Sequence, residues 1–134
     1  RHVISEAQRV EGALSVLEAM PEDASQTLGA LMNASHASCR DDYEISCPEL
    51  EDLTQAARDA GALGARLTGA GFGGCTVNLV PARATNRFIA AIDHAYYAPR
   101  GLAGDNTTQF VFTPAPGADI LLPADNAPPS SPGR

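Results

Sequence analysis

The sequence contains neither lysine nor tryptophan, and all nine of its basic residues are arginines. P-loop nucleotide-binding proteins and protein kinases both hold phosphate groups with a lysine, so both classes are excluded. The net charge of −7 argues against nucleic acid and anionic membranes as partners, because both require a basic surface. No apolar run approaches the roughly 20 residues of a membrane-spanning helix, and the first residues lack a signal-peptide pattern.

Cysteine is scarce as well, with three residues spread through the chain. An odd number in this arrangement does not indicate a disulfide framework, so we expect free thiols and a cytoplasmic location. With 134 residues, of which 44% are hydrophobic, the chain has the size of one globular domain. Because it begins at Arg1, without a methionine and within a helical pattern, we expect a fragment of a longer protein.

Apolar residues at three- and four-residue spacing predict four helices. They cover Val3–Leu17, Leu28–Arg40, Leu50–Ala60 and Thr85–Tyr97. Asp23 and Gln26 have the spacing of a capping box before the second helix, and Ser46 and Glu49 repeat it before the third. Gly61 is suited to the C-terminal end of the third helix.

Short alternating apolar runs predict two antiparallel strands, Ala65–Thr68 and Cys75–Val80, joined by a glycine-rich connection. Gln109–Thr113 and Ala118–Leu122 are further strand candidates. Helices followed by strands indicate the α+β class, with helices packed on one face of a mostly antiparallel sheet. The last residues, 123–134, are rich in proline and lack an apolar pattern, so they are predicted to be a disordered tail.

The most distinctive stretch is Leu67–Val77, LTGAGFGGCTV, which has four glycines within six residues. The spacing of Gly69, Gly71 and Gly74 formally matches the dinucleotide-binding fingerprint. That fingerprint requires a helix directly after it, and a strand follows here. Unshielded glycine backbone can donate amide hydrogen bonds to an anion. The spacing alone is equally compatible with a glycine-rich hairpin that binds no ligand.

Three stretches in order carry a resemblance to a known family. Leu67–Val77 closely resembles the third conserved motif of the GHMP small-molecule kinases, in its galactokinase form. Leu31–Leu50, with the sequence LMNASHASCRDDYEISCPEL, resembles galactokinases and N-acetylgalactosamine kinases. Arg1–Ala7 is similar to the helix that opens the C-terminal half of these enzymes, and the resemblance extends to about Tyr97.

The resemblance implies that residues 1–122 form a GHMP kinase C-terminal domain, which is a ferredoxin-like sandwich with additional helices. It implies an enzyme that transfers a phosphoryl group from ATP to the 1-hydroxyl of galactose, with Mg²⁺ as cofactor. In that family the catalytic aspartate and arginine, and most contacts to ATP and Mg²⁺, belong to an N-terminal domain. We expect that domain to be this chain's partner, and we assign no catalytic or metal-ligating residue here.

The same resemblance implies that the glycine loop lines the site for the sugar and ATP. The implied site-lining residues are Gly69, Ala70, Gly71, Phe72, Gly73 and Gly74. Arg40 and Tyr43 are candidates for supporting this loop. On its own the 134-residue chain is expected to be catalytically inactive.

Two other groups of residues are compatible with chemistry but are better explained by structure. Asp41 and Asp42 are adjacent carboxylates at a helix exit, where a solvated break is the simpler interpretation. His36 and Cys39 share a helix face, but a zinc site would need paired spacing and a fourth ligand, so half-buried packing explains them better.

Three alternative functions stay open at this point. An N-acetylgalactosamine kinase would share the same motifs, because in these families the contacts that discriminate the sugars lie mainly upstream of this chain. A galactokinase-like sensor would bind sugar and ATP and regulate transcription through a partner. A free-standing regulatory domain of ferredoxin-like form would require a start codon just before Arg1.

Overall fold

The computed structural model describes residues 1–104 and 108–115. Its main elements are α1 (His2–Ala19), α2 (Ala24–Asp41), α3 (Pro48–Asp59), β1 (Gly64–Thr68), β2 (Cys75–Leu79) and α4 (Thr85–Ile92). Short 3₁₀ and π turns flank α4 at Ala82–Ala84, Asp93–Tyr97 and Ala98–Arg100. The four predicted helices and the two strands around the glycine loop are confirmed. The predicted strand Ala118–Leu122 and the predicted tail 123–134 lie outside the described residues.

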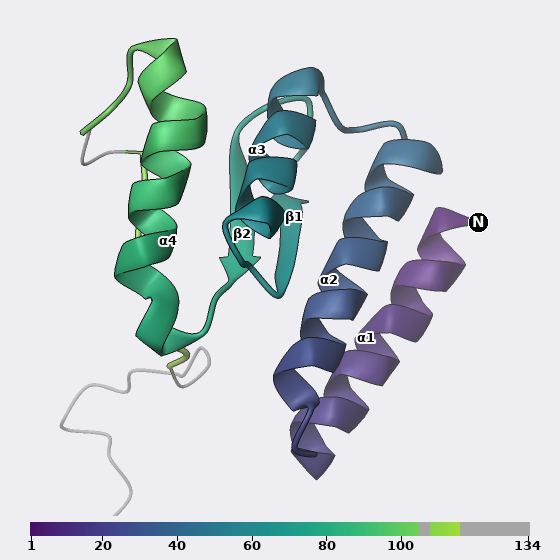
Figure 1. Cartoon of the computed structure of the whole chain (residues 1–134). Helices are drawn as coiled ribbons and strands as arrows, with labels where there is room; N and C mark the ends of the chain where they lie inside the picture. Colours follow the sequence, from purple (N-terminus) through teal and green to yellow (C-terminus); the bar gives the residue numbers. More distant parts are fainter. Residues whose placement is uncertain (105–107, 116–134) are drawn as a thin grey trace, which may run out of the picture.

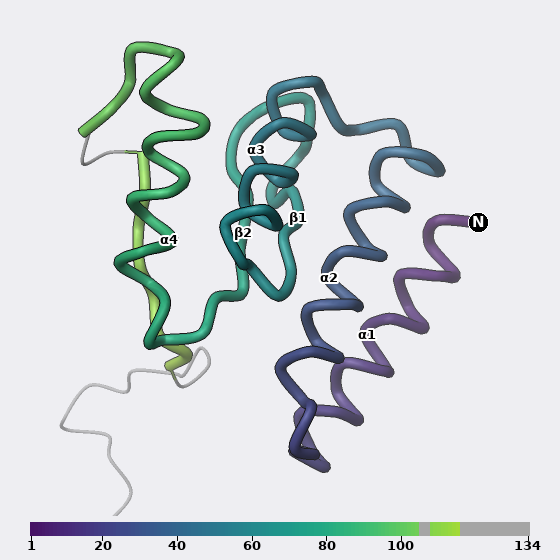
Figure 2. The backbone as a smooth tube through the Cα atoms, in the orientation of Figure 1, coloured from purple at the N-terminus to yellow at the C-terminus, as the bar shows by residue number. Residues whose placement is uncertain are grey.

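α1 and α2 form an antiparallel pair, and the two strands lie between α2 and α4 with α3 over them (Figures 1 and 2). The strands are antiparallel, with Gly64 opposite Leu79 and Thr68 opposite Cys75. The larger core cluster consists of Leu53, Ala57, Ala65, Phe88, Ile92 and Tyr96. A smaller cluster of Cys39, Leu50 and Leu67 lies where the glycine loop begins. The α+β class is therefore confirmed, with a two-stranded sheet in the described part of the chain.

α2 approaches the backbone of β1 closely. A Cβ atom on Gly29 would collide with the carbonyl of Leu63, and one on Gly64 would lie 2.7 Å from the Cα of Gly29. Asn33 Nδ2 donates a hydrogen bond to the Leu63 carbonyl (3.2 Å), and its Oδ1 accepts one from the Ala65 amide (2.9 Å). The side chains of α2 thus satisfy backbone groups along the edge of β1 that faces this helix.

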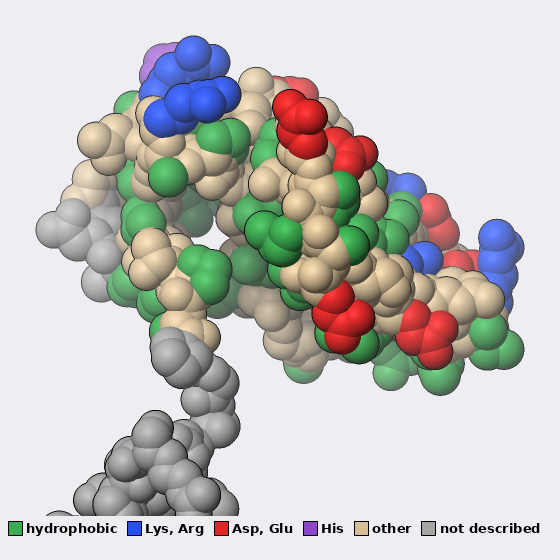
Figure 3. Space-filling view, turned by 90° about the horizontal axis from the view of Figure 1, so that it is seen from below, with side chains coloured by type: hydrophobic (Ala, Val, Ile, Leu, Met, Phe, Trp, Pro, Cys, Tyr) green, Lys and Arg blue, Asp and Glu red, His purple; other side chains and the backbone are tan. Residues whose placement is uncertain are grey.

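The first part of α1 contacts α2 through polar side chains. Ser35 Oγ donates to Glu6 Oε2 (2.8 Å), and His2 Nδ1 lies 2.9 Å from Ser38 Oγ. The apolar stripe of α1 lies on the opposite side, where Val3, Val10, Leu14 and Leu17 are 76%, 66%, 55% and 53% exposed. Figure 3 shows hydrophobic side chains at the surface on the side of the molecule where α1 lies. An amphipathic helix that turns its apolar face outward leaves that face available for a partner.

Neither predicted capping box forms. Asp23 is the N-cap of α2 but makes no side-chain hydrogen bond to the helix backbone. Cys47 is the N-cap of α3, and Ser46 instead donates its hydroxyl to Glu51. The second prediction was wrong by one residue, because α3 begins at Pro48 and so places Cys47 at the N-cap position. Gly61 follows the end of α3 with φ of 99°, as the sequence predicts.

The predicted strand Gln109–Thr113 is wrong, because residues 108–115 have no regular structure. Gln109 Nε2 donates to the Ile89 carbonyl (3.4 Å), and the Tyr97 hydroxyl donates to the Thr108 carbonyl (3.2 Å). These contacts hold the segment against α4 instead of a strand, while the apolar side chains from Phe110 to Phe112 stay exposed. Among the described helices, none is both long and apolar enough to cross a membrane.

Candidate functional site

The glycine loop, residues 69–74, connects β1 to β2 and has an unusual backbone. The φ angles of Gly69, Gly71, Phe72, Gly73 and Gly74 are 87°, 82°, 58°, 132° and 88°. Positive φ is a region that L-residues other than glycine rarely adopt. The composition of this loop is therefore a requirement of its conformation.

The outer side of the loop is bare backbone. A Cβ atom added at Gly69, Gly73 or Gly74 would meet nothing within 4 Å, so open space lies beside these residues. Ala70 is exposed, and the Phe72 ring is 72% exposed. The predicted site residues other than Gly71 thus border open space, and Phe72 carries the only large side chain among them.

The inner side of the loop rests on Ile45, in the connection between α2 and α3. The Phe72 amide donates to the Ile45 carbonyl (2.7 Å). A Cβ on Gly71 would collide with the same carbonyl and lie 2.8 Å from the Ile45 Cβ. The Ile45 amide in turn donates to the Cys39 carbonyl at the end of α2 (3.1 Å). Sequence reasoning missed Ile45, because a contact made by a backbone carbonyl has no side-chain signature.

The start of the loop is held by His36, which is 2% exposed. Its Nδ1 accepts a hydrogen bond from the Leu67 amide (3.2 Å), two residues before Gly69. Nε2 lies 3.0 Å from Thr54 Oγ1 and 3.1 Å from Glu51 Oε1. Because Nδ1 is an acceptor, the network assigns the ring proton to Nε2. Burial lowers the pKa of His36 below its ordinary value, which favours this neutral form.

The sequence-based interpretation of His36 as a half-buried packing residue was incomplete. The residue is almost fully buried, and both ring nitrogens have hydrogen-bond partners on other elements. A signal was present in the sequence, since Asn33 and His36 are three residues apart and so share a helix face. The described residues contain no group of three or more His, Cys, Asp or Glu side chains that could hold a metal ion.

Arg40 and Tyr43, the two predicted supports of the loop, make other contacts. Arg40 hydrogen-bonds to Asp41 (2.7 Å) and Glu51 (3.3 Å), and these bonds raise its pKa above the ordinary value. The Tyr43 ring stacks on His2 with 4.7 Å between the ring centres. Among the described residues, Arg40 contacts Glu51, and Glu51 contacts His36, which in turn binds the Leu67 amide before the loop. Direct support of the loop by either residue stays a prediction.

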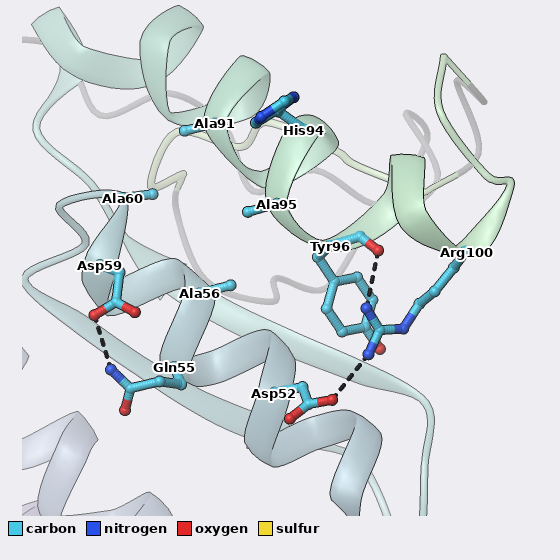
Figure 4. A pocket seen from close by; sticks show the side chains of 10 residues that line it. All are labelled: Asp52, Gln55, Ala56, Asp59, Ala60, Ala91, His94, Ala95, Tyr96 and Arg100. Carbon is cyan, nitrogen blue, oxygen red and sulfur yellow. Dashed lines mark hydrogen bonds and ion pairs between the residues drawn. The ribbon is translucent and has the colours of Figure 1, made fainter.

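A groove lies elsewhere, between α3 and α4. This groove has a volume of about 560 Å³ and a floor of Ala56, Ala60, Ala91 and Ala95 (Figure 4). At one end Arg100 donates to Asp52 (2.9 Å) and places its guanidinium 3.8 Å from the centre of the Tyr96 ring. None of the lining residues belongs to the glycine loop, so the groove is separate from the candidate site.

Comparison with known families agrees with this picture. The family model described as "GHMP kinases C terminal" matches residues 16–98, a range that contains the glycine loop together with Ile45 and His36. The chain belongs to the GHMP kinase family, as its C-terminal domain. The match ends before the irregular segment 108–115, so all the features that position the loop lie within the family's own part of the chain.

Curated and solved relatives of this GHMP kinase domain are several times longer than it. Galactokinase of Exiguobacterium sibiricum is 48% identical over 97 residues, which are 72% of this chain and 24% of that protein. The crystal structure of Lactococcus lactis galactokinase complexed with galactose matches with a TM-score of 0.61 and 41% identity, over 70% of this chain and 24% of that one. L. major mevalonate kinase in complex with R-mevalonate matches with a TM-score of 0.60 and 36% identity, over 66% and 26%. The chain thus spans about a quarter of the length of these relatives.

Proposed function

We propose that the full-length protein is a sugar kinase that transfers the γ-phosphoryl group of ATP to the 1-hydroxyl of galactose, giving galactose 1-phosphate and ADP. The observation that carries this proposal is the open glycine backbone of the loop, at Gly69, Gly73 and Gly74, in a GHMP kinase domain. The choice of galactose rests on the similarity to proteins named galactokinase, at 48% identity for the E. sibiricum relative.

The loop suits this chemistry because phosphoryl transfer requires positioning and charge neutralisation more than covalent work by the protein. Amides of glycine-rich backbone can donate to phosphate oxygens without a side chain in between. The open space beside Gly69, Gly73 and Gly74 supports such an approach. The residues Gly69 to Gly74 therefore line the ATP and sugar site in this proposal.

ATP suits the open side of the loop, since its phosphates are anions that accept hydrogen bonds from backbone amides. The described part of the chain contains no group of three or more His, Cys, Asp or Glu side chains that could hold a metal ion. When bound, Mg²⁺ neutralises charge on the phosphates. From the resemblance to galactokinases, we place most ligands of Mg²⁺, and the catalytic residues, in the part of the full-length protein that this chain does not include.

The outward apolar face of α1 supports a second folded part in the full-length protein. Val3, Val10, Leu14 and Leu17 form one stripe along this helix, and each is more than half exposed. We propose that the N-terminal domain covers this stripe and closes the site over the glycine loop. The 134-residue chain alone is then inactive, since it holds one wall of the site.

The proposal is tested by measuring ADP release by the full-length protein with galactose, N-acetylgalactosamine and no sugar. Galactose should be the preferred substrate, and product analysis should find the phosphate on the 1-hydroxyl. A preference for N-acetylgalactosamine would assign the protein to that kinase instead. Binding of sugar and ATP without turnover would indicate a sensor.

A loop variant connects the activity to the site. Gly73→Ala should lower kcat/KM, because alanine cannot adopt the φ of 132° at this position without strain. Gly104→Ala is the matched control, since Gly104 also has a positive φ (71°) and open space but lies outside the loop. Equal activities of the two variants would remove the loop from the proposed site.

A further inference from the structure

Two side chains of α2 form hydrogen bonds, one after the other along the chain, with backbone groups of β1 and of the residue before it. Asn33 pairs with the Leu63 carbonyl and the Ala65 amide, and His36 accepts from the Leu67 amide at 3.2 Å. The contact of His36 is the last of these before the chain enters the glycine loop. This contact, together with the pairing of Thr68 with Cys75, therefore fixes the backbone where the loop begins.

The second nitrogen of His36 fixes the ring from the other side. Nε2 faces Thr54 Oγ1 at 3.0 Å and Glu51 Oε1 at 3.1 Å, both on α3. Thr54 is 0% exposed and donates its own proton to the Leu50 carbonyl (2.9 Å), which leaves its oxygen as the acceptor. Glu51 is itself held by Arg40 at 3.3 Å. The ring can therefore neither rotate nor exchange its tautomer without breaking bonds in the interior.

We propose that His36 is the positioning residue of the glycine loop. Its Nδ1 accepts the hydrogen bond of the Leu67 amide and thereby holds the first residues of the loop in the position that catalysis requires. It touches neither sugar nor ATP. This inference rests on the proposed function for its effect on catalysis, but the effect on the loop can be measured independently.

The two ring nitrogens can be tested separately. In His36→Asn the side-chain oxygen can take the place of Nδ1 and accept from Leu67, whereas the bond to α3 is lost. In His36→Gln the terminal amide reaches toward Thr54 and Glu51 in place of Nε2, but no acceptor is left for the buried Leu67 amide. A purely structural histidine would make both variants equally harmful.

The experiment uses the full-length protein and measures kcat, the KM for ATP and the thermal midpoint for both variants. We expect kcat to fall by about 10- to 100-fold in His36→Gln, the scale of a displacement of about 1 Å at a reacting centre. His36→Asn should retain most of the activity despite a similar loss of thermal stability. Thr54→Val is the matched control, because it disturbs the α3 side of the same ring and leaves the Leu67 contact intact.

Hydrogen exchange of the loop amides, residues 69–74, gives a second measurement that does not depend on activity. Exchange should be faster in His36→Gln than in His36→Asn or Thr54→Val. If all three variants lose activity in proportion to their thermal midpoints and show the same exchange, the proposal is wrong. If the wild-type protein does not phosphorylate galactose, the proposed function fails, and the exchange data alone then decide the role of His36.

Discussion

The substitution Gly71→Ala isolates the contact between the glycine loop and Ile45. Gly71 has φ of 82°, so alanine there carries the left-handed strain of about 1–2 kcal/mol. A Cβ at this position would also collide with the Ile45 carbonyl. Forcing an atom into a packed site costs a further amount of about 1–3 kcal/mol. Together these effects should lower the free energy of unfolding by about 2–5 kcal/mol.

Gly101→Ala is the matched control for this prediction. Gly101 has a similar φ of 73°, but a Cβ there would meet nothing within 4 Å, so only the strain remains. The gain from a stiffer unfolded chain is the same in both variants and cancels in the comparison. Urea unfolding of the 134-residue chain, followed by circular dichroism at low protein concentration, gives both values. Equal unfolding free energies would refute the argument that the loop rests on Ile45.

Three further predictions concern other parts of the chain. Burial lowers the pKa of His36 in the folded state. Below the ordinary histidine pKa of 6.5 the unfolded chain therefore binds more protons than the folded chain, and the free energy of unfolding should decrease as the pH falls, by up to about 1.4 kcal/mol per pH unit. Urea midpoints at pH 7.5 and 5.5 measure this decrease, and a wild-type slope that persists in His36→Asn would contradict it. Val10→Glu and Leu14→Glu should weaken concentration-dependent self-association in sedimentation, because both side chains are exposed on the apolar face of α1. Gln8→Glu, at another exposed position of this helix, is the control. A wild-type chain that stays monomeric would contradict the prediction. A thiol reagent should modify the exposed Cys75 faster than the buried Cys39, because burial raises the pKa of the Cys39 thiol. Cys75→Ser should abolish the fast phase of the reaction. Equal rates for the two thiols would exclude this interpretation.

Much of the fold follows from periodicity, and the exceptions have physical reasons. The two strands were predicted to within one residue at each end, since β-branched and apolar residues alternate up to Pro81. The stripe of α1 correctly predicted a helix, but it does not indicate which side packs on the rest of the chain. Here α2 presents Ser35 and Ser38 to Glu6 and His2, so polar side chains meet along the first part of α1. An apolar stripe usually faces a core, and in this chain that core is not supplied by the described residues.

The backbone conformation of the glycine loop could be predicted from the sequence, but the contacts on which the loop rests could not. Four glycines in six residues permit a backbone with positive φ, and the structure has this backbone at all four. The position of the loop depends instead on the Ile45 carbonyl and on one ring nitrogen of His36. Neither contact could be derived from residue type, because a carbonyl is common to all residues and a helical histidine is compatible with many environments.

These contacts also bear on how a loop of glycines is kept ordered at all. Fixing six residues costs roughly 6–12 kcal/mol of backbone entropy, and glycine loses more freedom than other residues. A backbone hydrogen bond such as that from Phe72 to Ile45 contributes about 0.5–1.5 kcal/mol net. The supports seen on the inner side therefore offset only part of the cost. The remainder has to come from the paired strands at both ends of the loop and from contacts on its open side. An anion or a second domain over this surface would therefore stabilise the positive-φ backbone of the loop.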